Sequence, residues 1–161
     1  MASQFEITSI HEADVPQLQG LFRAAGLFVA ERDPFDYWLY ARLYSNSCLA
    51  ARKDDILIGT VLAFRDQSRN FKEMYVQDLA VAPATRRQGV ARALMQTLLE
   101  RADSWGIART WLTSHEENAA ATNLWRQLGF IPHLADNQEH GLWRTGNLQG
   151  PGRNRIVFIR E

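Results

Sequence analysis

The sequence has 161 residues, and 18 Lys and Arg balance 18 Asp and Glu, so its formal net charge is zero. This balance argues against a general nucleic-acid binder, because DNA affinity depends largely on neutralising phosphates with Lys and Arg. The first ten residues lack the features of a signal peptide, and no apolar run approaches the roughly 20 residues of a membrane helix. The single Cys48 excludes an internal disulfide and any multi-cysteine metal site. We expect one domain over residues 1–161, a cytoplasmic location and no bound metal.

The first half of the chain predicts a strand, two helices and a three-strand meander. Apolar and polar side chains alternate over residues 5–10, which is the period of a strand. Asp14 before Val15-Pro16, with Gln17 three residues after Asp14, predicts a helix start with a cap and a capping-box partner. A second start signal, Asp33-Pro34, leads into an aromatic helical stretch. The predicted helices cover about 14–25 and 34–44, and the predicted strands cover 48–52, 56–64 and 74–81.

The second half predicts alternating helices and strands. An apolar stripe with helical spacing predicts a helix over residues 85–104, which Gly106 ends. The Gly- and Pro-rich residues 146–154 predict a loop, either a plain hairpin connection or a lid beside an acceptor site. The remaining predicted elements are a strand over 107–113, a helix over 118–128, an extended segment from Phe130 and a last strand over 155–159. This order implies an α/β (α+β) fold, a mixed sheet covered by helices.

The segment from Asp78 to Ala91 carries the clearest chemistry. It runs from a strand, through a short loop with Arg86, Arg87 and Gly89, into the long amphipathic helix. A helix start has up to four unpaired N–H groups and a partial positive charge, so it can bind an anion. Glycine lets the backbone approach a ligand, and arginines donate charge-assisted hydrogen bonds to phosphate. From these features alone, a plain helix start with solvated arginines remains the alternative.

The segment Arg86-Arg87-Gln88-Gly89-Val90-Ala91 resembles the Arg/Gln-x-x-Gly-x-Gly/Ala motif of GNAT-type acyl-CoA N-acyltransferases. It follows a matching strand, residues 75–81. The second motif of the family resembles Asn118-Ala119-Ala120-Ala121, which leads through Leu124-Trp125 to Leu128-Gly129-Phe130. The element order is similar to the family fold from about residue 5 to residue 161. The resemblance implies a mixed central sheet of about seven strands flanked by four helices.

The resemblance also implies acetyl-CoA as the co-substrate. In this family the pyrophosphate of coenzyme A lies on the helix-start amides, which here implies binding by Arg86, Arg87, Gln88, Gly89, Val90 and Ala91. The pantetheine arm pairs with the fourth strand, so Leu79 and Val81 are expected to contribute main-chain groups. A main-chain N–H near Leu79 is the candidate donor to the oxyanion. The family places the side chain of the motif asparagine, Asn118, on the pantetheine arm; a helix N-cap is the alternative, and the two roles are compatible.

Asp78 is the first candidate for a catalytic carboxylate. Strand alternation groups it with Val76 and Ala80 on an otherwise apolar face, where a charge is costly unless it is paired. An alkylammonium must lose a proton before it attacks a thioester, and a carboxylate can take that proton; the alternative is a structural Asp paired with an arginine or backbone amides. Gln77 stands where polyamine-acetylating relatives often have an acid, and an amide cannot act as a base. The reserve base candidates, for which a solvated surface residue is the alternative, are Glu73, His115 and Glu116.

Trp125 departs from the family pattern. It stands seven residues after the motif asparagine, where many relatives have a tyrosine that protonates the departing thiolate. An indole N–H donates hydrogen bonds but is not a practical proton source, so Trp125 is expected to stabilise the thiolate weakly or to line the acyl pocket. Water, Tyr75 or release of free thiolate would then replace the general acid, since a thiol pKa near ~8.5 makes thiolate release tolerable.

Six aromatic side chains of the second predicted helix and the segment before it lie where this fold usually binds the acceptor. Such a cluster could receive an aromatic or apolar amine, or stack on a cation, and packing against the sheet is the alternative. Cys48, in an apolar strand, is expected to be a core thiol. The cluster consists of Phe28, Phe35, Tyr37, Trp38, Tyr40 and Tyr44.

These features together predict an N-acetyltransferase that transfers the acetyl group of acetyl-CoA directly to a primary amine of a small molecule. A protein N-terminus or lysine is the alternative acceptor. An acyl-CoA-binding sensor with weak or no catalysis is the alternative that Trp125 suggests. No nucleic-acid or membrane partner is expected, and a homodimer is left open.

Overall fold

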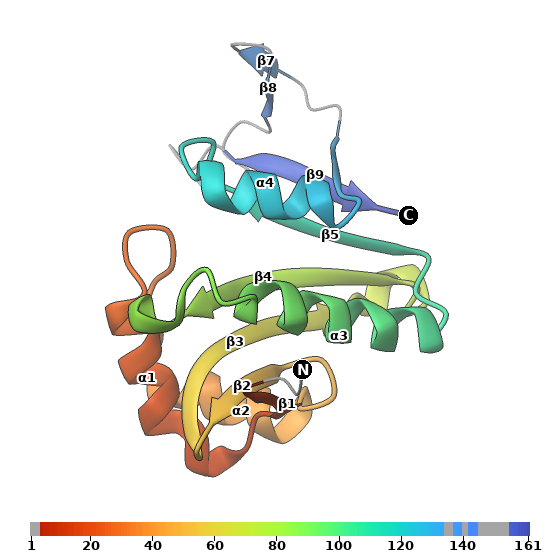
Figure 1. Cartoon of the computed structure of the whole chain (residues 1–161). Coiled ribbons are helices and arrows are strands. Elements are labelled where there is room, and N and C mark those ends of the chain that lie inside the picture. Colours follow the sequence, from red (N-terminus) through yellow and green to blue (C-terminus); the bar gives the residue numbers. More distant parts are fainter. Residues whose placement is uncertain (1–3, 134–136, 140–141, 145–154) are drawn as a thin grey trace. The chain divides into compact units, whose positions relative to one another are not determined.

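The computed structural model describes residues 4–133, 137–139, 142–144 and 155–161. The chain divides into two compact units, Met1–Phe64 with Gln77–Trp105, and Arg65–Val76 with Gly106–Glu161. One seven-stranded sheet, in the order β1-β2-β3-β4-β5-β9-β6, contains strands of both units. This mixed sheet, with the four α-helices of the described residues, confirms the predicted fold class (Figure 1).

From residue 4 on, where the described part begins, the first unit contains three α-helices and four strands. In it β2 is antiparallel to both β1 and β3, and its register shifts between Ala51 and Arg52. Single turns of 3-10 helix, Glu12–Asp14 and Pro83–Thr85, precede α1 and follow β4. The strand β4 (Glu73–Val81) belongs to this unit from Gln77 on. The other elements are β1 (Glu6–Ser9), α1 (Val15–Ala24), α2 (Pro34–Leu43), β2 (Leu49–Lys53), β3 (Ile56–Arg65) and α3 (Val90–Ser104).

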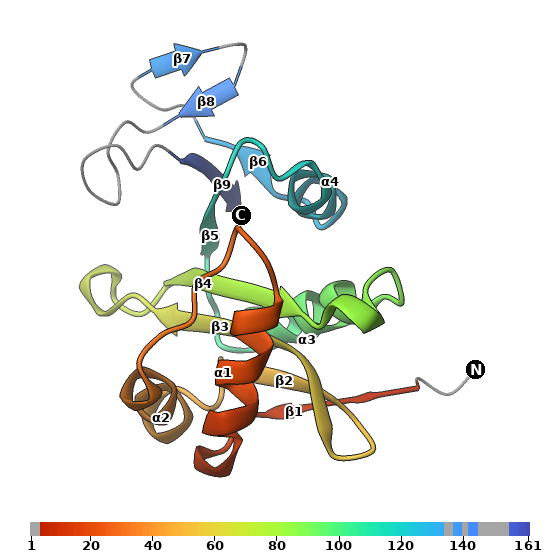
Figure 2. The same ribbon diagram turned by 90° about the vertical axis from the view of Figure 1, so that its left-hand side faces the viewer.

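Helices cover both faces of the strands in the first unit. Figure 2 shows α2 on one side of these strands and α3 on the other, and α1 shares one core with α2. The core under α1 and α2 includes the stacked rings of Phe22 and Tyr37, whose centroids are 5.5 Å apart. Cys48 is fully buried in this core, which confirms the prediction of a core thiol. The predicted stripe of α3 is buried at Leu94, Met95, Leu98, Leu99 and Ala102.

In the residues that the structure describes, the second unit contains the remaining strands and one α-helix. β5 is parallel to β4 over Glu73–Val76 and antiparallel to β9, and β9 also pairs with β6. β7 and β8 form a separate two-stranded sheet. The elements are the first part of β4, β5 (Arg109–Ser114), α4 (Ala119–Gln127), β6 (Ile131–Pro132), β7 (Asn137–Glu139), β8 (Leu142–Arg144) and β9 (Ile156–Arg160), and the turn Gln67–Arg69 precedes β4.

The long helix α3 begins at Val90, not at residue 85 as predicted. The residues before it form the 3-10 turn Pro83–Thr85 and a loop in which Arg87 and Gly89 have φ of 62° and 82°. A right-handed helix requires negative φ throughout, so these two residues keep the loop out of the helix. The sequence pattern placed the loop correctly but assigned its second half to the helix.

The start of α1 is also organised differently from the prediction. Asp14 is the N-cap, but its carboxylate makes no cap hydrogen bond and Gln17 is not its partner. Asp14 accepts from the His11 N–H at 2.7 Å and from Nη1 of Arg52 at 3.0 Å. Gln17 accepts from the Leu57 N–H at 2.8 Å. A capping box between His11 and Asp14 in the preceding 3-10 turn, together with contacts to Arg52 and Leu57 of distant strands, therefore replaces the predicted box of Asp14 with Gln17.

The C-terminal part of the chain contains two short strands that form a hairpin. The sequence did not predict β7 and β8, because strands of three residues are too short to show a period of two. The predicted loop over 146–154 lies outside the described residues. Within the described part of the chain, no helix has the length and apolar character needed to cross a membrane.

Candidate functional site

The loop between β4 and α3 has a backbone geometry suited to an anion. The φ values are −63° at Arg86, 62° at Arg87 and 82° at Gly89, and such changes of sign are typical of the N–H concavities that bind anions. Gly89 is the N-cap of α3 and no side chain caps this helix. The first bond of the helix runs from the Ala93 N–H to the Gly89 carbonyl at 2.9 Å. The N–H groups that precede Ala93 have no acceptor within the helix and can donate to a bound anion.

Gly59 of β3 lets the start of α3 lie close to the strands. A Cβ at this position would be 2.8 Å from Cγ1 of Val90, and 3.2 Å from both Cδ1 of Leu94 and the carbonyl oxygen of Ala80. Since real Cβ atoms are not found at the shortest of these distances, only glycine leaves room for the approach. Val90 is 2% exposed. The first turn of α3 is therefore fixed against the core of the first unit.

Two side chains of the loop bind nearby carbonyl groups. Nη2 of Arg86 donates to the carbonyl of Ala25, just after α1, at 2.5 Å. Nε2 of Gln88 donates to the carbonyl of Ala84 at 3.3 Å. Because a guanidinium carries five N–H donors, Arg86 can hold Ala25 and still donate to a phosphate. Arg86, Arg87 and Gln88, which come just before the helix start, are all exposed.

The carboxylate of Asp78 is paired with Arg32, which lies between α1 and α2. Nε and Nη2 of Arg32 donate to Oδ2 of Asp78 at 3.2 Å and 3.0 Å. The side chains are 29% exposed for Arg32 and 10% exposed for Asp78. This contact realises the alternative in which Asp78 pairs with an arginine. Both bonds end on Oδ2, so Oδ1 is left for a further donor.

Burial and charge act on this pair in opposite directions. Burial raises the pKa of Asp78 above its usual value, and the charge and hydrogen bonds of Arg32 offset only part of this. Burial lowers the pKa of Arg32, but the nearby charge of Asp78 and its hydrogen bond outweigh this and leave that pKa raised. Burial also raises the pKa of the Tyr37 and Tyr40 phenols, and the charges of Arg32 and Asp78 act on both of these groups. The site thus offers an ion pair whose carboxylate is more basic than that of an exposed Asp.

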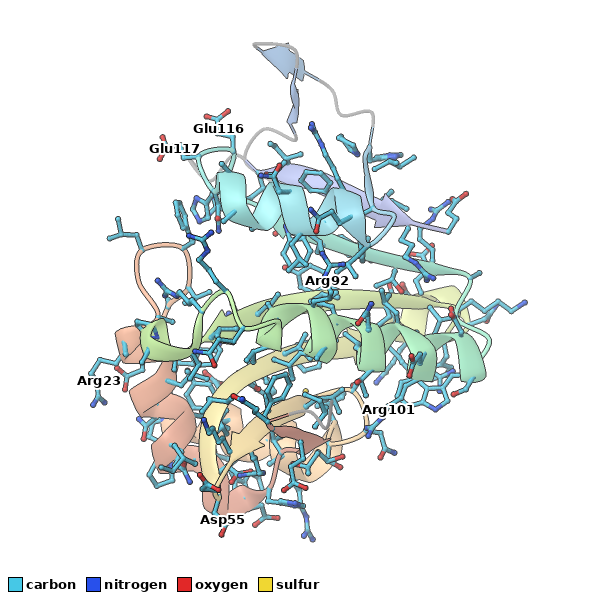
Figure 3. All side chains as sticks on the ribbon, viewed as in Figure 1. Arg23, Asp55, Arg92, Arg101, Glu116 and Glu117 are labelled. Atoms are coloured by element: carbon cyan, nitrogen blue, oxygen red, sulfur yellow. The ribbon has the colours of Figure 1, made fainter. Side chains whose placement is uncertain are left out.

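The reserve base candidates all lie in the second unit. Glu73, at the start of β4, has Oε1 3.6 Å from Nη1 of Arg109. His115 lies in the turn before α4, where burial and then the charge of Arg155 lower its pKa, which favours the neutral imidazole. Glu116 is exposed in the same turn, and Figure 3 shows its side chain directed away from the ribbon.

Asn118 and Trp125 have structural partners within the second unit. Oδ1 of Asn118 accepts from the Ala121 N–H at 3.2 Å, so Asn118 is the N-cap of α4, as the alternative interpretation predicted. Trp125 is 6% exposed, and its Nε1 donates to Oγ of Ser114 at 3.4 Å. Its ring meets that of Phe130 edge-on at 6.1 Å between centroids. The one N–H donor of this indole is therefore already bonded inside the unit.

The aromatic cluster divides into a packed half and an exposed half. Tyr37 is fully buried, and the rings of Tyr40 and Tyr44 each lie 5.0 Å from that of Phe64. The exposed half contains Phe28, Phe35 and Trp38, which are 40%, 60% and 39% exposed. The alternative was that most of these six side chains are packed inside the protein. Three of the six are packed in this way, and the other three are exposed.

Sequence reasoning missed two residues of this site, Arg32 and Gly59. A glycine inside an apolar strand is a signal of close backbone approach, so Gly59 could have been found. No sequence pattern links Arg32 to Asp78, which is 46 residues further along the chain. Of the predicted loop and strand residues, the first unit brings together Asp78, Leu79, Val81 and residues 86–91.

Comparisons with known proteins agree with the resemblance. A model of the Acetyltransferase (GNAT) family matches residues 9–130. The [Ribosomal protein bS18]-alanine N-acetyltransferase of Escherichia coli (strain K12) is 36% identical over 72 residues, 45% of this chain and 49% of that protein. An uncharacterized N-acetyltransferase of Mycobacterium bovis is 30% identical over 116 residues, 72% of this chain and 67% of that protein.

A solved structure with the same fold is the diaminobutyrate acetyltransferase of Paenibacillus lautus in complex with L-2,4-diaminobutyric acid and coenzyme A. It has a TM-score of 0.81 and 20% identity, and the match covers 98% of this chain and 95% of that one. This likeness confirms the fold. The chain spans about half the length of the first curated relative that it matches.

Proposed function

The chain belongs to the acetyltransferase (GNAT) family, and we propose that it is an N-acetyltransferase that transfers the acetyl group of acetyl-CoA to a primary amine of a small molecule. The observation that carries the proposal is the start of α3. There, residues 86–91 present helix-start N–H groups in a loop of alternating φ. Such a loop fits an anion such as a phosphate group, and the family resemblance favours the diphosphate of coenzyme A. The strand that leads into the loop carries the buried carboxylate of Asp78.

The proposed reaction is a direct transfer in which Asp78 takes the proton. The neutral amine nitrogen attacks the thioester carbon, a C–N bond forms, and the C–S bond breaks. The proton lost by the amine goes to Asp78, directly or through a water, and the sulfur leaves as thiolate. A main-chain N–H near Leu79 is our candidate donor to the oxyanion. The raised pKa of Asp78 favours this role, because a base works best when its pKa approaches the working pH.

We assign no proton transfer to Trp125. Its indole N–H donates to Ser114, and an indole is in any case not a practical acid. The thiolate is then protonated by water or leaves as such, since an ordinary thiol has a pKa near ~8.5. The contacts that the family resemblance implies for Asn118 and Trp125 with the pantetheine arm remain predictions.

A second candidate acceptor is a protein N-terminus. The segment between α1 and α2 carries Leu27, which is 97% exposed, and nearby Phe28 and Phe35 are 40% and 60% exposed. Exposed apolar side chains of this kind can contact a peptide. The E. coli relative is named as acting on alanine of a ribosomal protein, which supports including peptides among the acceptors to be tested.

The decisive experiment measures thiol release from acetyl-CoA with small amines, amino acids and peptides. We expect release that depends on the acceptor, and Asp78→Asn should lower kcat by about 10²-fold or more, as expected for loss of a general base. Asp55→Asn is the matched control, because Asp55 is exposed in the β2–β3 turn with a positive φ that Asn tolerates. Binding of acetyl-CoA without release by any acceptor would favour a sensor. Unchanged turnover in a folded Asp78→Asn variant would remove Asp78 from the mechanism.

A further inference from the structure

The ion pair between Arg32 and Asp78 leaves one edge of each group unused. Both bonds from Arg32 end on Oδ2 of Asp78. They come from Nε and Nη2, so the edge of the guanidinium that carries Nη1 faces elsewhere. In the part of the chain that the structure describes, Nη1 of Arg32 and Oδ1 of Asp78 have no hydrogen-bonding partner. The two side chains keep 29% and 10% of their surface exposed.

Arg32 is held in place before any ligand binds. The main-chain N–H of Arg32 donates to the hydroxyl of Tyr37 at 2.9 Å. Tyr37 itself is fully buried and its ring is stacked on that of Phe22. The next residue, Asp33, caps α2 by accepting from the Phe35 N–H at 2.9 Å. The backbone at Arg32 is thus fixed from both sides. A fixed guanidinium loses little conformational freedom when it binds a further partner.

The two unused edges have complementary chemistry. The free edge of a guanidinium matches a carboxylate, with two parallel N–H donors. A carboxylate oxygen such as Oδ1 accepts from an ammonium or amine. The charges of Arg32 and Asp78 cancel, so the pair does not attract a ligand that is only cationic, and a second ammonium would be repelled by the guanidinium. A ligand with one carboxylate and one amine satisfies both edges.

We propose that Arg32 is a specificity-determining residue that binds the carboxylate of an amino-acid acceptor, while Oδ1 of Asp78 receives its amino group. This inference rests on the proposed function, because it names the acceptor class of the same site. A free amino acid presents both groups a few bonds apart. A peptide N-terminus has no such carboxylate next to its amine, so peptides are expected to be poor acceptors.

The test compares amino acids with the amines that lack only the carboxylate. Three matched pairs suffice: L-lysine with 1,5-diaminopentane, L-2,4-diaminobutyrate with 1,3-diaminopropane, and L-tyrosine with tyramine. With acetyl-CoA and the wild-type protein, we expect kcat/KM to favour the amino acid in at least one pair by about 10- to 100-fold, the range of a charged hydrogen bond. A short peptide with a free N-terminus completes the panel.

Variants of Arg32 separate carboxylate recognition from a general loss of structure. Arg32→Gln should raise KM for the amino acid and should not raise KM for the matched amine, because the amine loses a repelling charge and no contact, so the preference falls toward one. Arg32→Lys should keep part of the preference, because it retains the charge but not the fork. Arg42→Gln is the control, since Arg42 is exposed and pairs with Glu12 on the surface.

Arg32→Gln leaves the carboxylate of Asp78 without its counter-charge, and this could unfold the variant. A binding measurement with a double variant keeps the inference testable in that case. In Arg32→Gln/Asp78→Asn both substituted side chains are neutral amides, which can hydrogen-bond to each other. Calorimetry with the amino acid, in the presence of coenzyme A, should then detect binding to the wild type and none to the double variant. Equal binding by both proteins would overturn the inference.

Failure of this inference and failure of the proposed function give different results. If the wild type acetylates amino acids and their matched amines equally well, or prefers the peptide, Arg32 does not select a carboxylate, yet the protein remains an N-acetyltransferase. If no acceptor releases thiol, the proposed function fails and the acceptor class falls with it. A preference for amino acids that Arg32→Gln removes and Arg42→Gln keeps supports the inference.

Discussion

Replacing Gly59 with alanine tests how the anion loop is held. The added Cβ would lie 2.8 Å from Cγ1 of Val90 and 3.2 Å from the Ala80 carbonyl. Crowding of this kind costs about 1–3 kcal/mol, and the better strand propensity of alanine returns about 0.5–1 kcal/mol. We therefore expect Gly59→Ala to lower the free energy of unfolding by up to about 2.5 kcal/mol and to weaken coenzyme A binding, because relief of the clash moves the first turn of α3.

The assay is urea unfolding followed by tryptophan fluorescence, combined with calorimetry of coenzyme A binding. Gly20→Ala is the matched control, because Gly20 is exposed within α1 and a Cβ there has no atom within 4 Å. That control should raise the free energy of unfolding by about 0.5–1 kcal/mol and leave binding unchanged. If Gly59→Ala gains stability like the control and binds coenzyme A normally, the close approach does not hold the loop.

Three further predictions concern buried groups. Asp14→Asn should cost about 3 kcal/mol, because it leaves the buried guanidinium of Arg52 without its counter-charge, and chemical unfolding at pH 7 measures this. Trp125→Phe should lower the melting temperature, because it removes ring volume and the bond to Ser114, without changing the pH profile of thiol release; a changed alkaline limb would show that the indole acts on the thiolate. Burial raises the pKa of Cys48 to about 12, so the native protein at pH 8 should resist a thiol-exchange reagent that labels the unfolded chain completely, and rapid labelling of the folded protein would contradict this.

The Asp14 prediction has a pH signature. Arg52 and the His11 N–H hold the pKa of Asp14 below its usual value despite the opposing effect of burial. The pair therefore contributes its full stability above the unfolded pKa of about 3.9, and this contribution is lost as the pH falls through the lower folded pKa. Glu12→Gln is the control, because the exposed pair of Glu12 with Arg42 should contribute less than about 1 kcal/mol. Equal pH dependence in wild type and Asp14→Asn would contradict the account.

The sequence predicted most elements because their signals are local. The apolar stripe of α3 and the Asp33 cap of α2 reappear in the structure, and the segment predicted as the first strand forms β1. The cap of α1 was predicted with the wrong partner, since Asp14 accepts from Arg52 whereas Gln17 accepts from Leu57. Such a contact depends on how β2 passes the helix start, and no local pattern carries that information.

The candidate site was predictable in its main chain and less so in its side chains. Glycine at position 89 and the helix that follows it are compatible with an anion loop, but only the family resemblance favoured this loop over a plain helix start. The partner of Asp78 was foreseen only as some arginine, because the pairing of Arg32 across 46 residues is a tertiary contact. The bond of Trp125 to Ser114 likewise depends on the packing of α4 against β5.

The central claim is that the amides at the start of α3 bind the diphosphate of coenzyme A. An NMR titration of the ¹⁵N-labelled protein tests it most directly, with coenzyme A and with pantetheine, which lacks the diphosphate. We expect the N–H signals of residues 86–92 to shift strongly with coenzyme A and hardly at all with pantetheine. Unshifted signals in this loop at saturating coenzyme A, with the largest shifts elsewhere, would contradict the account.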